Sequence, residues 1–298
     1  MRSIAIIGAG NGGFAAAAHL SSLEHRPHLY NRSEGTIAAV EAEGGALAVR
    51  HALREAGCSA PPPIAQTNTL TYICRKRSDE HVHISSLVKN VRCAALPSST
   101  REDVLETLVD LYPSLRRVPN VLHASLSNVN AVLHPPGIVL SAAWIEHTEG
   151  DFRFYYDAGT PAVANIMADI DEERLATADA WGLDVDPFPT MFADIGSTSE
   201  EAGESGSFRR TLRESEPNKS IKAPPSVDHR YFHEDIPFGL VPMSVLARHV
   251  DVETPVMDSL IAIASSINRT DYRKKGWTEA DLRLSEGNGS ADGSLDRV

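Results

Sequence analysis

The residues best suited to proton transfer lie in two stretches of the second half of the chain. The first covers residues 130–137 and reads Asn-Ala-Val-Leu-His-Pro-Pro-Gly. The residue before a proline is pushed out of the α region, so we predict that the backbone holds His134 in a fixed, non-helical position. A histidine at a fixed distance from a ligand suits general acid–base catalysis, although a structural role explains this stretch alone equally well.

The second stretch covers residues 228–239 and reads Asp-His-Arg-Tyr-Phe-His-Glu-Asp-Ile-Pro-Phe-Gly. Taken alone, this mixture of charged and aromatic residues is also typical of a solvated helix start. Together with His134 it contains the groups that reduction of an imine requires. These groups are a general acid/base, a carboxylate that orients it, and a guanidinium that binds a substrate carboxylate.

A glycine-rich turn near the N-terminus has the pattern of a dinucleotide site. It follows an apolar stretch at residues 3–7, precedes an alanine-rich stretch, and reads Gly8-Ala9-Gly10-Asn11-Gly12-Gly13. In such a turn Gly8 permits the tight bend, Gly10 lets the backbone approach a pyrophosphate, and Gly13 allows close packing of helix on strand. The following helix N-terminus offers N–H groups to the phosphates, so the sequence predicts NAD or NADP binding.

The residues after the second predicted strand favour NADP over NAD. An acidic side chain usually binds the ribose 2′-hydroxyl about 20 residues after the glycine turn, but here the chain continues with Asn31-Arg32-Ser33. The guanidinium fork of Arg32 suits a 2′-phosphate. Stacking of Arg32 on the adenine, or simple solvation, is the alternative interpretation.

The hydrophobic pattern predicts an α/β fold in two parts. We expect a Rossmann-like dinucleotide-binding domain at residues 1–122, a mostly α-helical catalytic domain at 123–284 and a disordered tail at 285–298. In the first domain we predict strands at 3–7, 28–30, 64–74, 80–87, 90–96 and 118–122, and helices at 14–20, 34–43, 47–57 and 102–111. In the second we predict helices at 128–147, 160–180, 238–249 and 254–267, and a mobile excursion at 196–220.

Composition excludes several classes of partner. The 298 residues carry a formal net charge of -12, which argues against a nucleic-acid or anionic-membrane surface. No stretch reaches the roughly 20 apolar residues that a membrane span needs. Cys58, Cys74 and Cys93 suit neither a disulfide framework nor a zinc site, and the histidines show no metal-ligand spacing. We therefore expect a cytoplasmic protein with no metal.

The glycine turn, the Asn130-x-x-x-His134-Pro135 motif and the 228–239 stretch together resemble the NAD/NADP octopine/nopaline dehydrogenase family, the opine dehydrogenases. The three motifs occur in the family's order, and the resemblance covers most of residues 1–280. It implies a helical domain of the 6-phosphogluconate dehydrogenase C-terminal-like kind and an active site in the cleft between the domains. It also implies that an amino acid condenses with a 2-keto acid and that NAD(P)H reduces the imine. A homodimer is compatible with this interpretation.

The resemblance also implies roles for individual residues. His134 matches the family's general acid/base, Asp235 the carboxylate that fixes its tautomer, and Arg230 the arginine that binds a substrate carboxylate. Asn130, one helical turn before His134, would hold a substrate carbonyl or the nicotinamide amide. We expect His229 and His233 to be solvated or supporting, without a direct role.

The first domain departs from the family's pattern. A full dinucleotide domain has six strands, but here Gly44-Gly45 leads straight into a helix that the family places late in the domain. Two strand–helix units, roughly 60 residues, are missing. The deletion is either real or a damaged or misassembled version of a longer protein, and we expect weaker cofactor binding and lower stability. Two alternatives stay open: a catalytically silent homologue that binds a nucleotide or an amino-acid-like ligand, and a reductase of a 2-keto acid alone.

Overall fold

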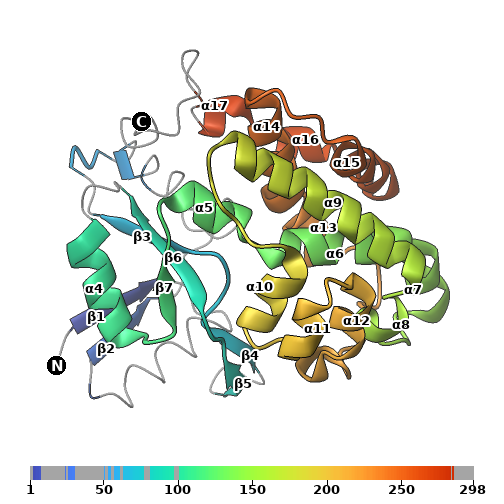
Figure 1. Ribbon diagram of the computed structural model, residues 1–298, viewed down its shortest axis with the longest axis horizontal. Coiled ribbons are helices and arrows are strands. Elements are labelled where there is room, and N and C mark those ends of the chain that lie inside the picture. The colour runs from blue at the N-terminus through green and yellow to red at the C-terminus, as the bar shows by residue number, and fades with distance from the viewer. Residues whose placement is uncertain are drawn as a thin grey trace. The chain divides into compact units, whose positions relative to one another are not determined.

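A computed structural model describes residues 3–7, 24, 26–30, 50, 53–54, 57–60, 63–76, 81–96, 101–282 and 284. The chain divides into two compact units, Met1–Val121 and Leu122–Val298 (Figure 1). The predicted tail at 285–298 and the predicted helices at 14–20 and 34–43 lie outside the described residues. So do the predicted cofactor-binding residues Gly8, Gly10, Asn11, Gly12, Gly13, Asn31, Arg32 and Ser33.

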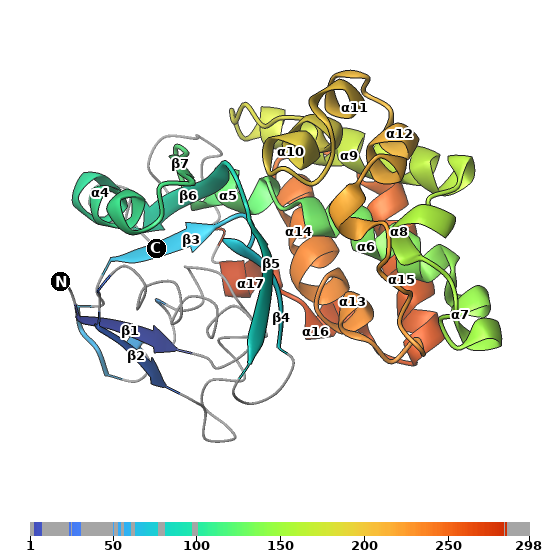
Figure 2. The ribbon, with the colours of Figure 1, turned by 90° about the horizontal axis from the view of Figure 1, so that it is seen from below.

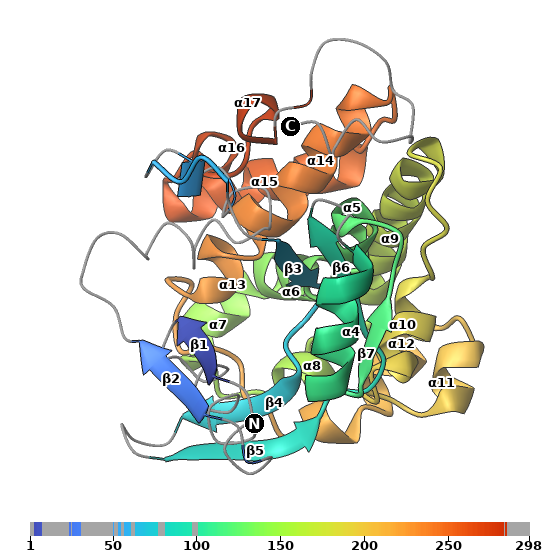
Figure 3. The same ribbon diagram turned by 90° about the vertical axis from the view of Figure 1, so that its left-hand side faces the viewer.

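The described residues of the N-terminal unit form three small sheets, one parallel, one mixed and one antiparallel. β1 (Ser3–Ile7) and β2 (Arg26–Tyr30) pair in parallel, as a dinucleotide-binding half requires, and Ile7 lies opposite Tyr30. A three-stranded sheet has the order β3-β6-β7, with an antiparallel and a parallel pair, and β4 and β5 form an antiparallel pair (Figure 3). Their bounds are β3 (Ile64–Thr67), β4 (Tyr72–Lys76), β5 (Val82–Leu87), β6 (Val91–Leu96) and β7 (Leu115–Arg117).

One helix packs on the three-stranded sheet. α4 (Arg101–Leu111) contacts β6 and β7, and every residue of β6 is buried. The predicted helix at 102–111 is confirmed, and Pro113 follows its end. Of the predicted helix at 47–57, residues 50, 53, 54 and 57 are described; the first three are helical, and Gly57 lies in a turn.

Two predicted strands in this unit are wrong. The strand expected at 64–74 is two strands, because the Asn68 side chain accepts the Arg92 N–H in place of a backbone carbonyl and the chain leaves the ladder there. The strand expected at 118–122 lies earlier, at β7, and α5 (Val121–Leu126) follows it. Pro119 lacks the N–H that would continue the ladder.

The helical unit is built around α6 (Val129–Leu140), nearly all of whose residues are buried. It contacts α7, α9, α10, α13, α15 and η3, so that other helices of the unit surround it (Figure 2). A helix that is apolar around its whole circumference is stable only in such a position. The other elements are α7 (Ala142–Thr148), α8 (Phe154–Asp157), α9 (Pro161–Ala180), α10 (Phe188–Asp194), α11 (Glu200–Glu204), α12 (Phe208–Arg213), η2 (Glu216–Asn218), α13 (Arg230–His233), η3 (Ile236–Leu240), α14 (Val241–His249), α15 (Pro255–Asn268), α16 (Tyr272–Lys275) and α17 (Glu279–Leu282).

The backbone at His134 is helical, so the prediction of a non-helical position is wrong. His134, Pro135 and Pro136 all lie inside α6. The two prolines lack the N–H groups that would donate to carbonyls one turn earlier, which ordinarily kinks or ends a helix. Here the surrounding helices hold α6 from several sides and offset that loss. The long helix predicted at 128–147 is nevertheless broken, since α6 and α7 meet at Ser141.

The mobile excursion predicted at 196–220 is also wrong, because this segment forms α11, α12 and η2. Its serines cap helices: Ser199 accepts the Ala202 N–H, and Ser207 accepts the Arg210 N–H. Ala202 is fully buried, so the small residues that suggested mobility allow close packing instead.

A buried ion pair joins three elements of the helical unit. Arg174 on α9 is 0% exposed and donates to Asp171, to the Leu126 carbonyl at the end of α5, and to the Asp186 carbonyl. Asp171 also accepts the Phe188 N–H at the start of α10. Within the described part of the chain, no helix has both the length and the apolar composition that crossing a bilayer requires.

Candidate active site

His134 and Asp235, which are 101 residues apart in the sequence, are in direct contact. The Nδ1 atom of His134 lies 2.9 Å from Oδ2 of Asp235. The imidazole is 10% exposed and the carboxyl group 16% exposed, so little water competes for this bond. Because an ionised carboxylate only accepts, the Nδ1 atom carries the proton and Nε2 is left as the nitrogen that can exchange one.

The segment after Asp235 explains how the carboxylate reaches α6. Asp235 immediately precedes η3, a single π-helical turn, and such turns are frequent at functional sites. A Cβ atom on Gly239 of η3 would lie 3.0 Å from the Ala131 Cβ on α6. Gly239 therefore permits the close approach of η3 to α6. This explains why a glycine follows Asp235 at this spacing.

Sequence reasoning missed a third member of this cluster, Tyr155 on α8. Its hydroxyl lies 2.9 Å from Nε2 of His134, and the residue is 7% exposed. With the proton on Nδ1, Nε2 accepts and the tyrosine hydroxyl donates. The aromatic sequence at 154–156 gave a weak signal, since nothing in its spacing connects it with His134.

Tyr231 on α13 covers one face of the imidazole. The two rings stack with their centroids 3.9 Å apart and their planes 17° from parallel. The Tyr231 hydroxyl also lies 3.3 Å from the Tyr155 hydroxyl. His134 is thus bounded by a carboxylate at Nδ1, a phenol at Nε2 and an aromatic ring on one face.

The two predicted substrate-binding residues lie on the elements that carry this cluster. Arg230 begins α13, and its exposed guanidinium forms a 2.7 Å ion pair with Glu234. Asn130 lies one turn before His134 on α6, and its backbone N–H donates to the Asn128 side chain. The structure thus joins His134 to Asp235 directly, while Arg230 and Asn130 lie on neighbouring turns of α13 and α6.

The two other histidines of the 228–239 stretch have different partners. His229 caps α13 by accepting the Tyr231 N–H, and burial, followed by the charges of Arg230 and His134, lowers its pKa. His233 lies between Asp228, 2.7 Å from its Nε2 atom, and Tyr272, whose hydroxyl is 2.8 Å from its Nδ1 atom. Burial, reinforced by the Asp228 charge, raises the pKa of Tyr272 to about 12.

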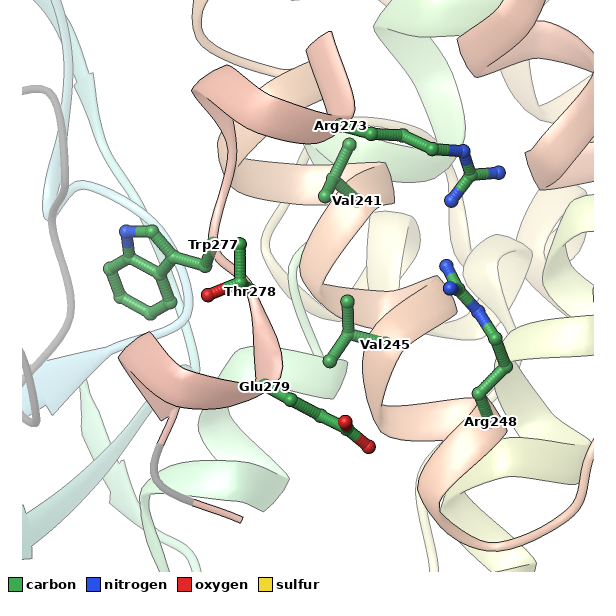
Figure 4. Close-up of a pocket in the computed structure, with 7 residues that line it drawn as sticks. All are labelled: Val241, Val245, Arg248, Arg273, Trp277, Thr278 and Glu279. Carbon is green, nitrogen blue, oxygen red and sulfur yellow. The ribbon is translucent and has the colours of Figure 1, made fainter.

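The described residues offer limited sites for other ligands. Within them, no group of three or more His, Cys, Asp or Glu side chains could hold a metal ion. A cavity of about 250 Å³ lies in the helical unit, and none of the predicted site residues lines it. Figure 4 shows the residues that do. They are Val241, Val245, Arg248, Arg273, Trp277, Thr278 and Glu279.

The strand pairing of the N-terminal unit fits a dinucleotide. Because β1 and β2 are parallel and Ile7 pairs with Tyr30, the chain leaves both strands at the same edge. The glycine turn follows Ile7 in the sequence, and Asn31-Arg32-Ser33 follows Tyr30. In parallel α/β sheets, the carboxyl ends of the strands are where dinucleotides bind.

Comparisons with known proteins agree with this arrangement. Residues 117–268 match the model of the NAD/NADP octopine/nopaline dehydrogenase α-helical domain. An opine dehydrogenase of Arthrobacter sp. (strain 1C) is 35% identical over 257 residues, which are 85% of this chain and 69% of that protein.

Two solved structures show the same fold. Octopine dehydrogenase with NADH and L-arginine gives a TM-score of 0.71 at 16% identity, covering 100% of this chain and 98% of that one. NADP⁺-bound yersinopine dehydrogenase gives 0.69 at 13% identity, covering 100% and 96%. The fold is therefore α/β, with a Rossmann-like unit followed by a helical unit. The chain belongs to the NAD/NADP octopine/nopaline dehydrogenase family and is an NAD(P)-dependent dehydrogenase.

Proposed function

We propose that this chain condenses an amino acid with a 2-keto acid and reduces the product to a secondary amine. The observation that carries the proposal is the buried 2.9 Å contact between His134 and Asp235, which leaves Nε2 of His134 to exchange protons. A histidine so oriented acts as the general acid/base on the carbonyl oxygen or the nitrogen. Opine dehydrogenase from Arthrobacter supports the reaction class through its sequence identity.

The proposed roles of the protein's own residues follow from their positions. Asp235 holds His134 in one tautomer, and His134 moves the proton. Arg230 binds a substrate carboxylate as a bidentate partner, which requires that the carboxylate replace Glu234 in its exposed ion pair. Asn130 donates to a carbonyl one helical turn away. When bound, the reduced nicotinamide supplies the hydride to the imine carbon.

We infer a preference for NADP over NAD from Arg32. Tyr30, which precedes the segment of Arg32, and Ile7, which precedes the glycine turn, end adjacent parallel strands. This supports a cofactor site at the edge that the two strands share. An arginine there suits a 2′-phosphate better than a 2′-hydroxyl. Equal affinity for NADPH and NADH, measured by calorimetry, would contradict the preference.

We further propose that residues 1–122 form a shortened cofactor domain and residues 123–284 the catalytic domain. The described strands of the first unit form three separate small sheets, and the matched region is 69% of the Arthrobacter enzyme's length. Both observations support the loss of about two strand–helix units. We expect weak binding of NADP(H) as the consequence. If cofactor binding is lost altogether, the chain is a catalytically silent homologue. Tight binding measured by calorimetry on the purified chain would overturn this inference.

The test of the main proposal measures NADPH absorbance with a panel of 2-keto acids and amino acids. We expect consumption that needs both substrates and disappears in His134→Ala. Consumption without the amine indicates a simple 2-keto acid reductase instead. No consumption with any pair, at cofactor concentrations shown to saturate binding, indicates the silent homologue.

A further inference from the structure

Tyr155 fills the hydrogen-bonding site of the nitrogen of His134 that exchanges a proton. Nδ1 is held by Asp235, and the Nε2 atom has one hydrogen-bonding site, which the Tyr155 hydroxyl fills at 2.9 Å. The Tyr231 ring stacks on one face of the imidazole, and only 10% of the side chain is exposed. A substrate atom that touched Nε2 would have to displace Tyr155.

The local structure holds Tyr155 in place. The backbone just before Tyr155 is tied to a distant segment: Phe154 N–H donates to the Ile221 carbonyl and Ala223 N–H to the Phe152 carbonyl. A Cβ atom on Gly137 of α6 would lie 2.9 Å from the Phe154 ring, so that ring packs directly on the helix that carries His134. Passage of a proton through the Tyr155 hydroxyl needs no movement of the tyrosine, whereas direct contact of a substrate with Nε2 of His134 does.

We propose that the Tyr155 hydroxyl relays the proton between Nε2 of His134 and the substrate. This proposal rests on the proposed function, since it concerns the proton of that reaction. The Tyr231 hydroxyl, 3.3 Å away on a half-buried residue, gives Tyr155 a second polar neighbour. Tyr155 therefore has one hydrogen-bonding direction towards His134 and another away from it.

In the direction of condensation, the relay moves one proton from His134 through Tyr155 to the substrate. Protonated His134 loses its Nε2 proton to the Tyr155 oxygen while the Tyr155 hydroxyl gives its own proton to the hydroxyl of the carbinolamine. The C–O bond breaks, water leaves, and the nitrogen lone pair forms the C=N bond of an iminium ion. The imidazole ends neutral with its proton on Nδ1, and the tyrosine is unchanged. The carbon of the iminium ion is then the position that a bound reduced nicotinamide would reduce.

The chain provides a matched control for the test. Tyr272 is also hydrogen-bonded to a histidine, at 2.8 Å, but to Nδ1 of His233 where Tyr155 meets Nε2 of His134. It is fully buried and has no part in the proposed reaction. We compare Tyr155→Phe with Tyr272→Phe. Each change removes one hydroxyl that is bonded to a histidine and keeps the ring that packs around it.

Two measurements test the relay. With saturating NADPH we expect Tyr155→Phe to lower kcat about tenfold to a hundredfold, at or below the lower end of the roughly 100-fold to 10,000-fold contribution of general acid–base catalysis. We expect little change in KM, and we expect Tyr272→Phe to leave kcat unchanged. In NMR spectra of ¹⁵N-histidine protein, we expect the ring nitrogens of His134 to shift only in Tyr155→Phe and those of His233 only in Tyr272→Phe.

The two outcomes that overturn the relay are distinct from failure of the proposed function. A His134 spectrum unchanged by Tyr155→Phe contradicts the hydrogen bond itself, whether or not the protein turns over. A shifted spectrum with unchanged kcat shows that Tyr155 moves aside and that Nε2 meets the substrate directly. Absence of turnover by the parent chain contradicts the proposed function alone, because the spectrum needs no turnover.

Discussion

Two hydrogen-bonded chains of Asp, His and Tyr side chains, an inner and an outer one, lie in the helical unit. They differ in burial and in which ring nitrogen of the histidine faces the carboxylate. In the inner chain the Asp235 carboxyl group is 16% exposed and the His134 imidazole 10%, and Tyr155 completes it. In the outer chain Asp228 is 89% exposed and His233 28%, and the buried Tyr272 completes it. The hydrogen-bond distances are similar, so distance does not separate them.

Burial decides which chain can control a proton. Water competes with Asp228 for His233, and exposed pairs of this kind contribute little energy. Around His134 little water competes, so Asp235 fixes one tautomer and one ring orientation. We therefore assign proton transfer to the inner chain and a supporting role, linking α13 to α16, to the outer one.

The largest expected effect is on the histidines. His134→Asn should lower kcat/KM by about 100-fold to 10,000-fold, the usual contribution of a general acid/base, while His233→Asn should change it less than about threefold. NADPH consumption at saturating cofactor measures both, with thermal unfolding as the control for folding. Equal losses of kcat/KM in the two variants would contradict the assignment of proton transfer to the inner chain.

The carboxylates should show the next largest difference. Asp235→Asn should lower kcat about 100-fold, because an amide no longer restricts His134 to the tautomer with its proton on Nδ1. Asp228→Asn changes an exposed side chain and should leave kcat within about twofold of the parent value. Steady-state kinetics of the two variants checks this, and a full-activity Asp235→Asn would contradict the assignment.

A smaller effect concerns stability at high pH. The pKa of Tyr272 is about 12 in the folded protein because of burial and the Asp228 charge, above the value near 10 of an exposed tyrosine. The unfolded chain loses this proton first, so the stabilisation from Tyr272 is complete below about pH 10 and is lost as pH rises towards 12. Tyr272→Phe should flatten this part of the curve of unfolding free energy against pH.

Urea unfolding at pH 8 to 11.5 measures that slope. At pH 8 the same variant should lose about 1 kcal/mol, the typical value of one hydrogen bond. A slope as steep as that of the parent chain would show that other groups determine the alkaline loss.

Sequence alone pointed to two of the three members of the inner chain, His134 and Asp235, and not to Tyr155. The motifs around His134 and Asp235 have fixed neighbours, such as Gly239, whose missing side chain allows η3 to approach α6. Tyr155 has no such signal, since a pairing of distant backbone segments brings it to His134. Its role depends on tertiary contacts that no local spacing encodes.

The same reason explains the errors in secondary structure. From Pro135 we predicted a non-helical backbone at His134, but the surrounding helices keep α6 helical there. From the serines at 199 and 207 we predicted a mobile segment, but both side chains cap helices. Strand β1 was predictable because it is a short apolar stretch before a clear turn signal. Of β2 the prediction covered residues 28–30 and missed Arg26 and Pro27, which carry no strand pattern. Local patterns thus gave the elements, and packing decided where they end.

The smallest effect concerns the exposed ion pair of Arg230 and Glu234. In the sequence, Glu234 lies directly before Asp235 of the inner chain. Glu234→Gln should change stability by less than about 0.5 kcal/mol, because both side chains are exposed and solvent screens them. If Arg230 binds the substrate carboxylate, the variant should also lower KM for the keto acid a few-fold, since no competing carboxylate remains. Arg230→Lys should raise KM instead, because lysine lacks the bidentate fork. Kinetics at fixed amine concentration separates the two, and an unchanged KM in both variants would remove Arg230 from the substrate site.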